Sequence, residues 1–380
     1  IVVGNGLTAK LALINLVKEK FNILWVTNKK NGIADKRTTL LSISSINFLK
    51  EINLWEDSND NYFPTKVINI SSTHEKFTEL KNEDSSPLAW LVSNQVLNEN
   101  IQKQLEVYKV SNQITEINKK IINIIFKPNG VEVDFGSMKY LSKLIIGADG
   151  AKSSVRELVG IKSIKKLATK QAIVCSLKHD NIYPNTSWQR FLDTGTIALL
   201  SMQNIKNNGF SSMIWILPEK LINKNLELSS KEFEEKINGV FGNKLGKFKI
   251  ADPITVWKIN RINVPDPIKN RCVVIGDAAH SIYPLSGQGF NLSIGDIKCL
   301  SRELMLAKNR GLDFGEIETL NIYKNKRKIN VKTATIISDG LDWLFTSSPK
   351  LLKNIASYGI IKIDKLNLFK KLVVKSMSQQ

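Results

Sequence analysis

The stretch over residues 271–296, RCVVIGDAAHSIYPLSGQGFNLSIGD, limits what this chain can fold into more than any other part of it. The apolar run over residues 273–275 is short enough to predict a buried strand, and Leu292, Ile294 and Ile297 recur at helical spacing beyond it. A turn rich in glycine joins the two elements. This order of strand, turn and helix allows backbone N–H groups to meet an anionic or electron-rich ligand.

Single residues of this turn indicate what such a ligand would contact. Asp277 follows Gly276 at the end of the strand, where its carboxylate suits hydrogen bonds from sugar hydroxyls. Gly287 and Gly289 carry no Cβ, so a flat ring can lie against the backbone there. An ordinary strand-turn-helix with a capping aspartate is the alternative interpretation, and the length of the pattern GDAAHxxxPxxGQGxN argues against it.

A second glycine-rich turn lies close to the start of the sequence. A helical pattern follows Gly4, Gly6 and Ala9, and an expected strand at residues 22–27 completes a βαβ unit. The spacing GxGxxA is that of the dinucleotide-binding fingerprint. In it, Gly4 allows the tight turn, Gly6 lets a pyrophosphate approach, and a small residue at position 9 lets helix and strand pack. A tight turn in another kind of α/β protein is the alternative.

The end of the second strand departs from this fingerprint. An Asp or Glu usually ends that strand and holds the adenosine ribose, whereas Thr27 and Asn28 stand at this place. Either side chain can hydrogen-bond a ribose, but less strongly than a carboxylate does. The departure weakens the dinucleotide interpretation without removing it.

A third strand and turn occur in the middle of the chain, which reads GADGAKSSVR there. We expect a buried strand that turns tightly at Gly150 and leads into a helix capped by Ser153 or Ser154. Alternating apolar and polar residues predict a β-meander over residues 111–144, and residues 165–265 predict a second sheet.

The three motifs, taken in order, resemble those of the aromatic-ring hydroxylases, the single-component FAD monooxygenases similar to para-hydroxybenzoate hydroxylase. Within that class, the linking segments resemble the ubiquinone-biosynthesis hydroxylases. Residues 35–55, where the spacing of Leu41 and Leu54 predicts a helix, resemble the D-x-R…L-G-L-W block of that family. The segment SNQVL at residues 93–97 resembles its E-N-R-V-L, and SMIWILP at residues 212–218 resembles its S-x-V-W-x-x-P strand.

This resemblance implies an α/β fold. The expected architecture is a Rossmann-like FAD domain with a β-meander, interrupted by a β-sheet substrate domain and followed by C-terminal helices. The expected boundaries are 1–66, 92–164 and 266–345 for the discontinuous FAD-binding domain, 67–91 and 165–265 for the substrate-binding sheet, and 346–380 for the C-terminal helical region.

The resemblance also assigns roles to single residues. Arg37 would reach toward the flavin nucleotide, with a solvated basic residue as the alternative. Gln95 stands where the family has an Arg, and a glutamine cannot supply the positive charge that an Arg would offer to a phosphate. Asp149 would lie behind the pyrophosphate or would only brace its loop. No side chain is assigned to catalysis, and three scattered histidines indicate no metal site. The expected cofactor-binding residues are Gly4, Gly6, Ala9, Arg37, Gln95, Asp149, Gly150, Gly276, Asp277 (at the ribityl chain), Pro284, Gly287, Gln288 and Gly289 (at the flavin ring) and Asn291, which supports that loop.

The implied reaction uses bound FAD, with NAD(P)H as a transient co-substrate because the sequence shows no second glycine-rich βαβ unit. NAD(P)H reduces FAD, O2 adds to give a flavin C4a-hydroperoxide, and the distal oxygen is transferred to a phenolic ring. The cofactor carries the difficult chemistry. The expected substrate is a polyprenyl phenol of ubiquinone biosynthesis. Two other classes stay open: another flavoenzyme, such as a halogenase or a prenyl reductase, and a non-catalytic FAD-binding scaffold of a biosynthetic complex, which Thr27 and Gln95 favour.

Composition bears on partners. The 380 residues include 54 Lys and Arg against 35 Asp and Glu, a formal net charge of +19, and three cysteines that form no CxxC pair. The cysteine usage fits a reducing compartment. The charge suits nucleic acid or an anionic membrane. Because the sequence contains no nucleic-acid motif, we expect a membrane surface and no nucleic acid, although a coding bias toward Lys, Asn and Ile would give the same charge.

The end of the sequence supports the same expectation. Residues 366–377 predict a basic amphipathic helix that suits an anionic bilayer, with a helix packed on its own domain as the alternative. No apolar run of about 18 residues predicts a transmembrane helix. We therefore expect a cytoplasmic protein held peripherally on the inner face of the membrane, with other ubiquinone-biosynthesis proteins as further candidate partners.

Overall fold

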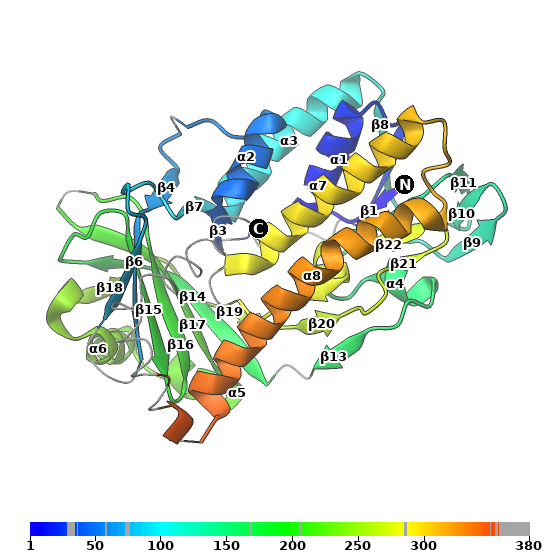
Figure 1. Cartoon of the computed structure of the whole chain (residues 1–380). Helices are drawn as coiled ribbons and strands as arrows, with labels where there is room; N and C mark the ends of the chain where they lie inside the picture. Colours follow the sequence, from blue (N-terminus) through cyan, green and yellow to red (C-terminus); the bar gives the residue numbers. More distant parts are fainter. Residues whose placement is uncertain are drawn as a thin grey trace.

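The computed structural model describes residues 1–28, 35, 37–57, 59–72, 77–166, 169–205, 207–284, 287–349, 351–353 and 356. Figure 1 shows a helix-rich lobe beside a lobe built on a large sheet, with one long helix running along both. The main helices of the first lobe are α1 (Leu7–Lys18), α2 (Ile43–Glu51), α3 (Asn94–Val110) and α7 (Gln288–Asn309), and the long helix is α8 (Ile317–Asp342).

A mainly parallel sheet forms the centre of the first lobe, with the strand order β21-β22-β12-β1-β2-β8. Its central strands are short and almost wholly apolar, as expected for a sheet that is covered on both faces. Trp25 and Ile146 pack beneath the helices, whereas Val26 and Ile145 face the opposite side. The strands are β1 (Val2–Val3), β2 (Ile23–Thr27), β8 (Ile114–Asn118), β12 (Ile145–Gly147), β21 (Ile268–Lys269) and β22 (Cys272–Val274).

The opposite face of this sheet is covered by an antiparallel meander of β9 (Asn123–Lys127), β10 (Gly130–Asp134) and β11 (Lys139–Ser142). The meander was predicted from Ser111 onward, but the first alternating segment, β8, joins the parallel sheet instead. It does so because it follows α3, which carries the chain across the sheet and returns it parallel to β2.

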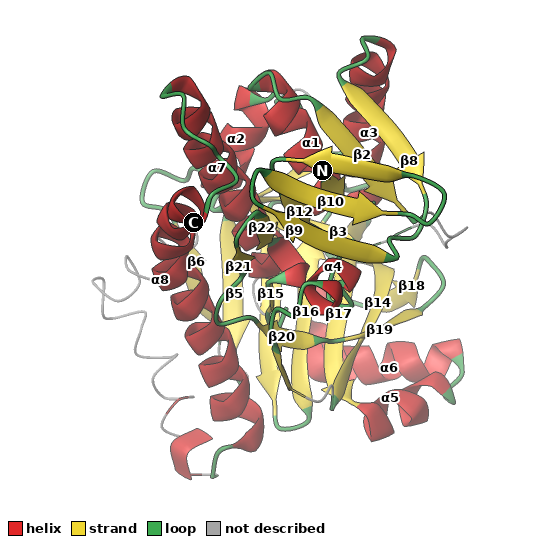
Figure 2. Cartoon of the chain, turned by 90° about the vertical axis from the view of Figure 1, so that its right-hand side faces the viewer, coloured by secondary structure: helices red, strands yellow, loops and turns green. Residues whose placement is uncertain are grey.

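The second lobe is a mostly antiparallel sheet with the order β18-β14-β17-β16-β15-β5-β6, and β19 also pairs with β14. Figure 2 shows this sheet below the parallel one, with α5 (Glu219–Leu226) and α6 (Ser230–Phe241) against it. The predicted domain boundaries themselves stay a prediction. The strands are β5 (Val67–Ser71), β6 (Thr78–Lys81), β14 (Lys170–His179), β15 (Thr186–Leu192), β16 (Gly195–Ser201), β17 (Gly209–Pro218), β18 (Phe248–Ile250) and β19 (Thr255–Lys258).

Two small sheets connect the lobes. The expected helix through Leu41 is wrong at its start, because residues 38–42 form a strand and the helix begins only after Ser42, whose hydroxyl accepts from Ser45 N. The first small sheet contains β3 (Thr38–Ser42), β7 (Ala89–Ser93) and β4 (Tyr62–Thr65), and the second contains β13 (Ile164–Lys166), β20 (Arg261–Asn263) and β23 (His280–Ser281).

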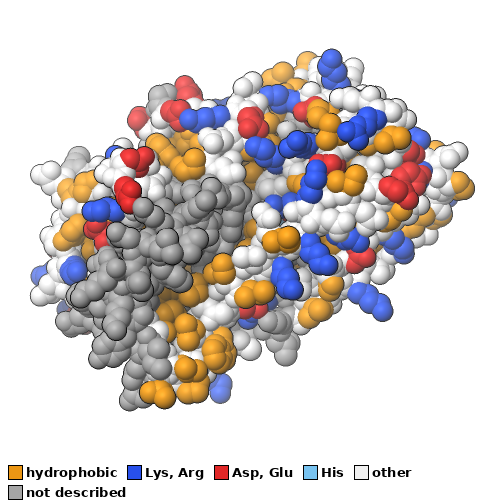
Figure 3. Space-filling view, viewed as in Figure 1, with side chains coloured by type: hydrophobic (Ala, Val, Ile, Leu, Met, Phe, Trp, Pro, Cys, Tyr) orange, Lys and Arg blue, Asp and Glu red, His pale blue; other side chains and the backbone are white. Residues whose placement is uncertain are grey.

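Helix α8 continues into the π-helical turn η4 (Trp343–Ser347), and Figure 3 shows basic and apolar side chains along this part of the surface. In the described part of the chain, no helix is both long and apolar enough to span a bilayer. The helix expected over residues 366–377, with most of the region 346–380, lies outside the described residues. The remaining elements are α4 (Ser154–Leu158), η1 (Gly242–Leu245) and η2 (Gly276–Ala278).

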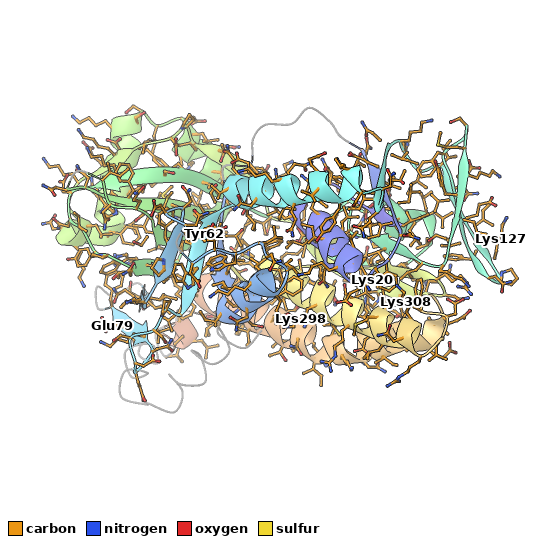
Figure 4. The ribbon with its side chains drawn as sticks, turned by 90° about the horizontal axis from the view of Figure 1, so that it is seen from above. Lys20, Tyr62, Glu79, Lys127, Lys298 and Lys308 are labelled. Carbon is orange, nitrogen blue, oxygen red and sulfur yellow. The ribbon has the colours of Figure 1, made fainter. Side chains whose placement is uncertain are left out.

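Helices α1 and α7 lie side by side over the parallel sheet. In Figure 4, Lys308 near the end of α7 lies beside Lys20, which follows α1. The ammonium group of Lys308 donates to the carbonyl oxygens of Lys20 at 2.6 Å and Glu19 at 3.2 Å. These bonds satisfy two of the carbonyls that the end of a helix leaves without partners, and they fix α7 on the sheet beside α1.

Candidate functional site

The three glycine-rich turns meet at one edge of the parallel sheet. Strands β1, β12 and β22 are neighbours in the register Val3↔Gly147↔Val274, so the turns that follow them are also neighbours. A Cβ built on Gly276 would lie 2.8 Å from Thr8 Cγ2. The first and last motifs are therefore in contact, although about 270 residues separate them in the sequence.

The first turn leaves room for a diphosphate. Gly4 has φ +137°, and a Cβ on it would lie 2.3 Å from the carbonyl oxygen of Ala148, so this position admits only glycine. Around Gly6, no described atom lies within 4 Å of where a Cβ would be. Helix α1 starts there without a described side-chain cap, so its first N–H groups are free to meet an anion. Ala9 is fully buried and packs behind the turn.

Asp277 lies in the short helix η2, directly after the strand β22 and the turn at Gly276. Its side chain is accessible, yet protein surrounds it on most sides, as for a group at the floor of a cleft. This surrounding protein raises the pKa of the Asp277 carboxyl, and the charges of His280 and Arg37 act in the opposite direction. An accessible acceptor in this position suits hydroxyl donors from a ligand.

A buried charge network, which the sequence did not reveal, holds this turn from behind. Asp296 on α7 is completely buried and accepts from Gly276 N at 3.0 Å, from His280 Nε2 at 2.5 Å and from Arg327 Nε at 2.9 Å. Burial alone would raise the pKa of Asp296, but the His280 and Arg327 charges and the Gly276 N–H lower it to about 2. The pKa of His280 is raised by Asp296, against the effect of its own burial.

The middle motif is tied to both of its neighbours. Asp149 Oδ2 accepts from Ser154 N at 2.7 Å and from Val155 N at 3.1 Å, which braces the turn, while its buried Oδ1 has no partner among the described residues. Gly150 has φ +80° and open space beside it. Arg156, 1% exposed, donates to the Ala278 carbonyl at 2.7 Å. The predicted cap of α4 is Ser153, which accepts from Arg156 N at 3.0 Å.

Arg37 and Gln95 come from adjacent strand ends but differ in their surroundings. Arg37 pairs with Asp35 at 2.7 Å, lies 4.1 Å above the Trp257 ring and is near enough for its charge to act on Asp277. It is therefore held in place rather than freely solvated. Gln95 is exposed, and its amide donates to Glu99 at 2.9 Å along α3.

The carboxylate that the end of β2 lacks is present on the next strand. Thr27 is fully buried, and its hydroxyl donates to Glu116 Oε1 of β8 at 3.4 Å. Glu116 also pairs with Lys109 Nζ at 2.6 Å. A carboxylate thus lies beside the position where the fingerprint places one, although it comes from another part of the sequence.

A cavity of about 70 Å³ lies between the last glycine-rich turn and the second sheet. Most of its wall is apolar, which suits an organic ring more than a polar ligand. The Thr196 hydroxyl on this wall is buried, at 2% exposure of the residue, and has no hydrogen-bond partner among the described residues. The lining residues are Thr38, Leu40, Ser42, Ile68, Ala89, Ser187, Trp188, Gln189, Thr196, Ala198, Leu200, Ile214, Ile216, Pro284, Gly287, Gln288 and Asn291.

Asn291 fixes the turn that closes this cavity. Its amide donates to the carbonyl oxygens of Leu40 at 2.9 Å and Gly287 at 3.1 Å, and its oxygen accepts from Ser42 N at 2.9 Å and Ser45 Oγ at 2.7 Å. The turn is thereby bonded to β3 and α2. Gly289, at the start of α7, has open space where a Cβ would lie, with Ile282 Cγ1 at 4.0 Å.

These features fit FAD, the cofactor that the sequence predicted. The open cradle at Gly6 suits the diphosphate, the accessible Asp277 suits the ribityl hydroxyls, and the Asp149 Oδ1 atom is a buried acceptor still without a donor. Gly287 has φ +64° and packs on Leu40, so the backbone of the turn faces the cavity closely.

Comparison with known proteins agrees with this geometry. Residues 1–335 match the family model described as FAD binding domain. The human protein named ubiquinone biosynthesis monooxygenase COQ6, mitochondrial, is 24% identical over 400 residues, which cover 93% of this chain and 84% of that protein. The ubiquinone hydroxylase UbiL of Rhodospirillum rubrum is 28% identical over 235 residues, which cover 62% of this chain and 54% of that protein.

Solved structures with the same architecture include p-nitrophenol 4-monooxygenase PnpA from Pseudomonas putida, with a TM-score of 0.75 and 15% identity over 100% of this chain and 98% of that one. The protein pqsL of Pseudomonas aeruginosa, described as a probable FAD-dependent monooxygenase, gives a TM-score of 0.75 and 13% identity over 95% and 98% of the two chains. At these identities the likeness concerns the fold alone, and it confirms the predicted α/β architecture.

Proposed function

This chain belongs to the FAD-binding domain family, and from that premise we propose that it is an FAD-dependent aromatic monooxygenase that hydroxylates a prenylated phenol in ubiquinone biosynthesis. The observation that carries the proposal is the position of the cavity. It opens between Pro284, Gly287 and Gln288 of the last glycine-rich turn and the apolar face of the second sheet. A ring in that cavity would lie directly beside the part of the turn that we assign to the flavin.

The chain supplies binding and orientation. The start of α1 with Gly6 would hold the diphosphate, Asp277 would accept from the ribityl hydroxyls, and the backbone at Gly287 would face the flavin ring. When bound and reduced by NAD(P)H, FAD supplies the activation of O2 that the hydroxylation needs. The balanced reaction takes phenol, O2, NAD(P)H and a proton to the hydroxylated phenol, NAD(P)+ and water.

The sheet side of the cavity would bind the substrate. Leu200, Ile214 and Ile216 give an apolar wall that excludes water from the reacting ring. Ser187, Gln189 and Thr196 are polar residues on this side, and the buried Thr196 hydroxyl, which has no partner among the described residues, can bond an oxygen of the phenol. The names of the curated relatives, which refer to ubiquinone biosynthesis, support a ring that carries a prenyl chain.

Membrane association and contacts with other ubiquinone-biosynthesis proteins belong to the same proposal. A polyprenyl phenol partitions into a bilayer, so the enzyme that acts on it has to reach the bilayer surface. The net charge of +19 supports an anionic surface as the site of attachment.

Turnover with isotopic oxygen tests the proposal. The purified protein is supplied with NAD(P)H and a panel of prenylated phenols under 18O2, and products are analysed by mass spectrometry. We expect one 18O atom in the ring of at least one phenol. If every phenol leaves only NAD(P)H-dependent H2O2 and no oxygenated product, the hydroxylase assignment is wrong and another flavoenzyme takes its place, whereas a protein that binds no FAD and consumes no NAD(P)H supports the scaffold interpretation.

A further inference from the structure

A line of exposed apolar residues runs along the outer side of α8 and ends at the first residue of η4. Ile322, Ile329, Ile336 and Trp343 follow one another at intervals of seven residues, and they are 48%, 73%, 59% and 52% exposed. Seven residues make nearly two helical turns, so these side chains lie on one side of the helix. We call these four residues the α8 stripe. Single exposed apolar residues are ordinary, whereas a row of four along one helix indicates an interaction surface.

Basic residues accompany the α8 stripe. Lys326, Lys328 and Lys332 are exposed beside it. The two acidic residues near the end of the helix are already paired, because Asp339 bonds Arg261 and Asp342 lies 2.6 Å from Lys170 Nζ. Lys326 is likewise paired, with Glu303 at 2.6 Å, and Glu318 is exposed one turn before Ile322. Lys328 and Lys332 leave the middle of the stripe with a positive balance, which suits an anionic partner.

A second copy of the chain fits this surface less well than a lipid bilayer. Helix pairs bury two apolar positions per heptad, but the second position here is occupied by Asn325, Lys332 and Asp339. One narrow apolar row between basic residues is instead the pattern of a helix that lies on a membrane surface. The row ends at Trp343, and tryptophan favours the level of the lipid headgroups.

We propose that the α8 stripe is the surface by which this protein binds an anionic membrane, with α8 lying parallel to the bilayer. From Ile322 to Trp343 the contact would extend about 30 Å at 1.5 Å per residue. The proposal specifies the membrane association that is part of the proposed function and rests on it. It differs from the expectation for residues 366–377, because it assigns the binding to another helix.

The inner side of α8 connects this surface to the cavity. Ser338 Oγ donates to the Tyr283 carbonyl at 2.8 Å, and Ala334 packs against Ile282, so α8 holds the segment that leads into Pro284 at the cavity wall. A membrane on the outer side would lie roughly one helix diameter, about 10 Å, from that segment. The ring of a membrane-borne phenol can then reach the cavity while its chain stays near the lipid.

Vesicle flotation with the full-length holoprotein tests the proposal. Vesicles of phosphatidylcholine, with and without an equal share of phosphatidylglycerol, are mixed with the wild type and with the double variant Ile329→Gln/Ile336→Gln. We expect the wild type to float with the anionic vesicles and the variant to bind about tenfold more weakly or worse, because two inserted apolar side chains are lost. The matched control is Val107→Gln/Val110→Gln on α3, where the valines are 66% and 86% exposed, and it should bind like the wild type.

The other outcomes are distinguishable. Equal flotation of the wild type and the α8 variant, with binding lost only when residues 364–380 are removed, overturns the proposal in favour of the C-terminal segment. Self-association of the wild type in sedimentation velocity, abolished in the variant and unaccompanied by lipid binding, overturns it in favour of a second copy. Hydroxylation of a short-chain, water-soluble prenyl phenol should be equal in the wild type and the variant. Failure of that reaction in both, with flotation still dependent on the stripe, refutes the proposed activity and leaves the membrane surface supported.

Discussion

The substitution Asp296→Asn removes the central charge of the network behind the last glycine-rich turn. The side chain keeps its size, but Arg327 and His280, whose side chains are 11% and 4% exposed, lose the anion that they contact. Breaking a buried ion pair by removing one partner costs about 3–5 kcal/mol, because the other charge stays buried without compensation. We therefore expect a large fall in the free energy of unfolding.

The pKa of Asp296 gives an independent magnitude. It is lowered from 3.8 to about 2. At about 1.4 kcal/mol per pKa unit, this difference corresponds to roughly 2–3 kcal/mol of stability at neutral pH. This value counts only the preference for the charged form, so it sets the lower end of the expected loss, and the buried-pair value sets the upper end.

Urea unfolding at pH 7, followed by tryptophan fluorescence and circular dichroism, measures this loss. The matched control is Asp57→Asn, which breaks the Lys50–Asp57 pair at the surface, where Asp57 is 67% exposed. Exposed pairs contribute less than about 1 kcal/mol, so the control should unfold close to the wild type. If the free energy of unfolding of Asp296→Asn also lies within about 0.5 kcal/mol of that of the wild type, the network does not stabilise the fold.

Three further predictions concern the site. Asp277→Ala should raise the Kd for FAD about 10- to 100-fold in a fluorescence titration, because hydrogen bonds to a charged acceptor are lost. The circular dichroism should stay unchanged. Unaltered FAD affinity would contradict the assignment of Asp277 to the ribityl hydroxyls. Thr196→Val should raise the Kd for a prenylated phenol about 3- to 10-fold, while the Kd for the methyl ether of that phenol and the Kd for FAD stay unchanged. Thr196→Ser, which keeps the hydroxyl, should behave like the wild type. The stability of the wild type should fall as pH drops from about 4 toward 2, because Asp296, whose pKa is depressed, becomes protonated. The stability should also decline as pH rises above 6.5, the ordinary pKa of a histidine. The pKa of His280 is raised in the folded protein, so the stabilisation from its charged form is complete below that pH and is lost above it. Asp296→Asn should show a smaller acid slope, since Asp35 and Asp313 also have lowered pKa values, and no slope from His280. An acid slope as steep as that of the wild type would assign it to those other carboxylates.

The sequence was most informative at positions where the backbone conformation of a single turn restricts which residue can stand there. Gly4 and Gly150 could be predicted because their conformation or a close contact excludes a side chain, and each follows a short apolar run. Leu41 was misassigned for the same kind of reason. Its spacing to later leucines is helical, but Thr38 and Thr39 favour a strand, and pairing of β3 with β7 decides the outcome.

The residues that hold the site from behind were not predictable in this way. His280, Asp296 and Arg327 lie 16 and 31 residues apart along the chain, and only the packing of α7 against α8 brings them together. Arg156 is the last residue of the motif GADGAKSSVR, but its partner, the Ala278 carbonyl, has no side-chain signature at all. Such contacts depend on tertiary structure, which a periodic pattern does not contain.

The pair of Thr27 and Glu116 bears directly on whether this chain is an enzyme or an empty scaffold. The missing acidic residue at the end of β2 was one of two features that favoured a scaffold. Because β2 and β8 are parallel neighbours, Glu116 places its carboxylate beside Thr27, where Lys109 also pairs with it. Gln95 carries no charge, and Arg37, which lies over Trp257 and pairs with Asp35, is a separate position of the site rather than its replacement. Of the two features that favoured a scaffold, the one at β2 is therefore weakened by a carboxylate from the neighbouring strand and the one at Gln95 is not, so an FAD-binding measurement on the purified protein decides between enzyme and scaffold.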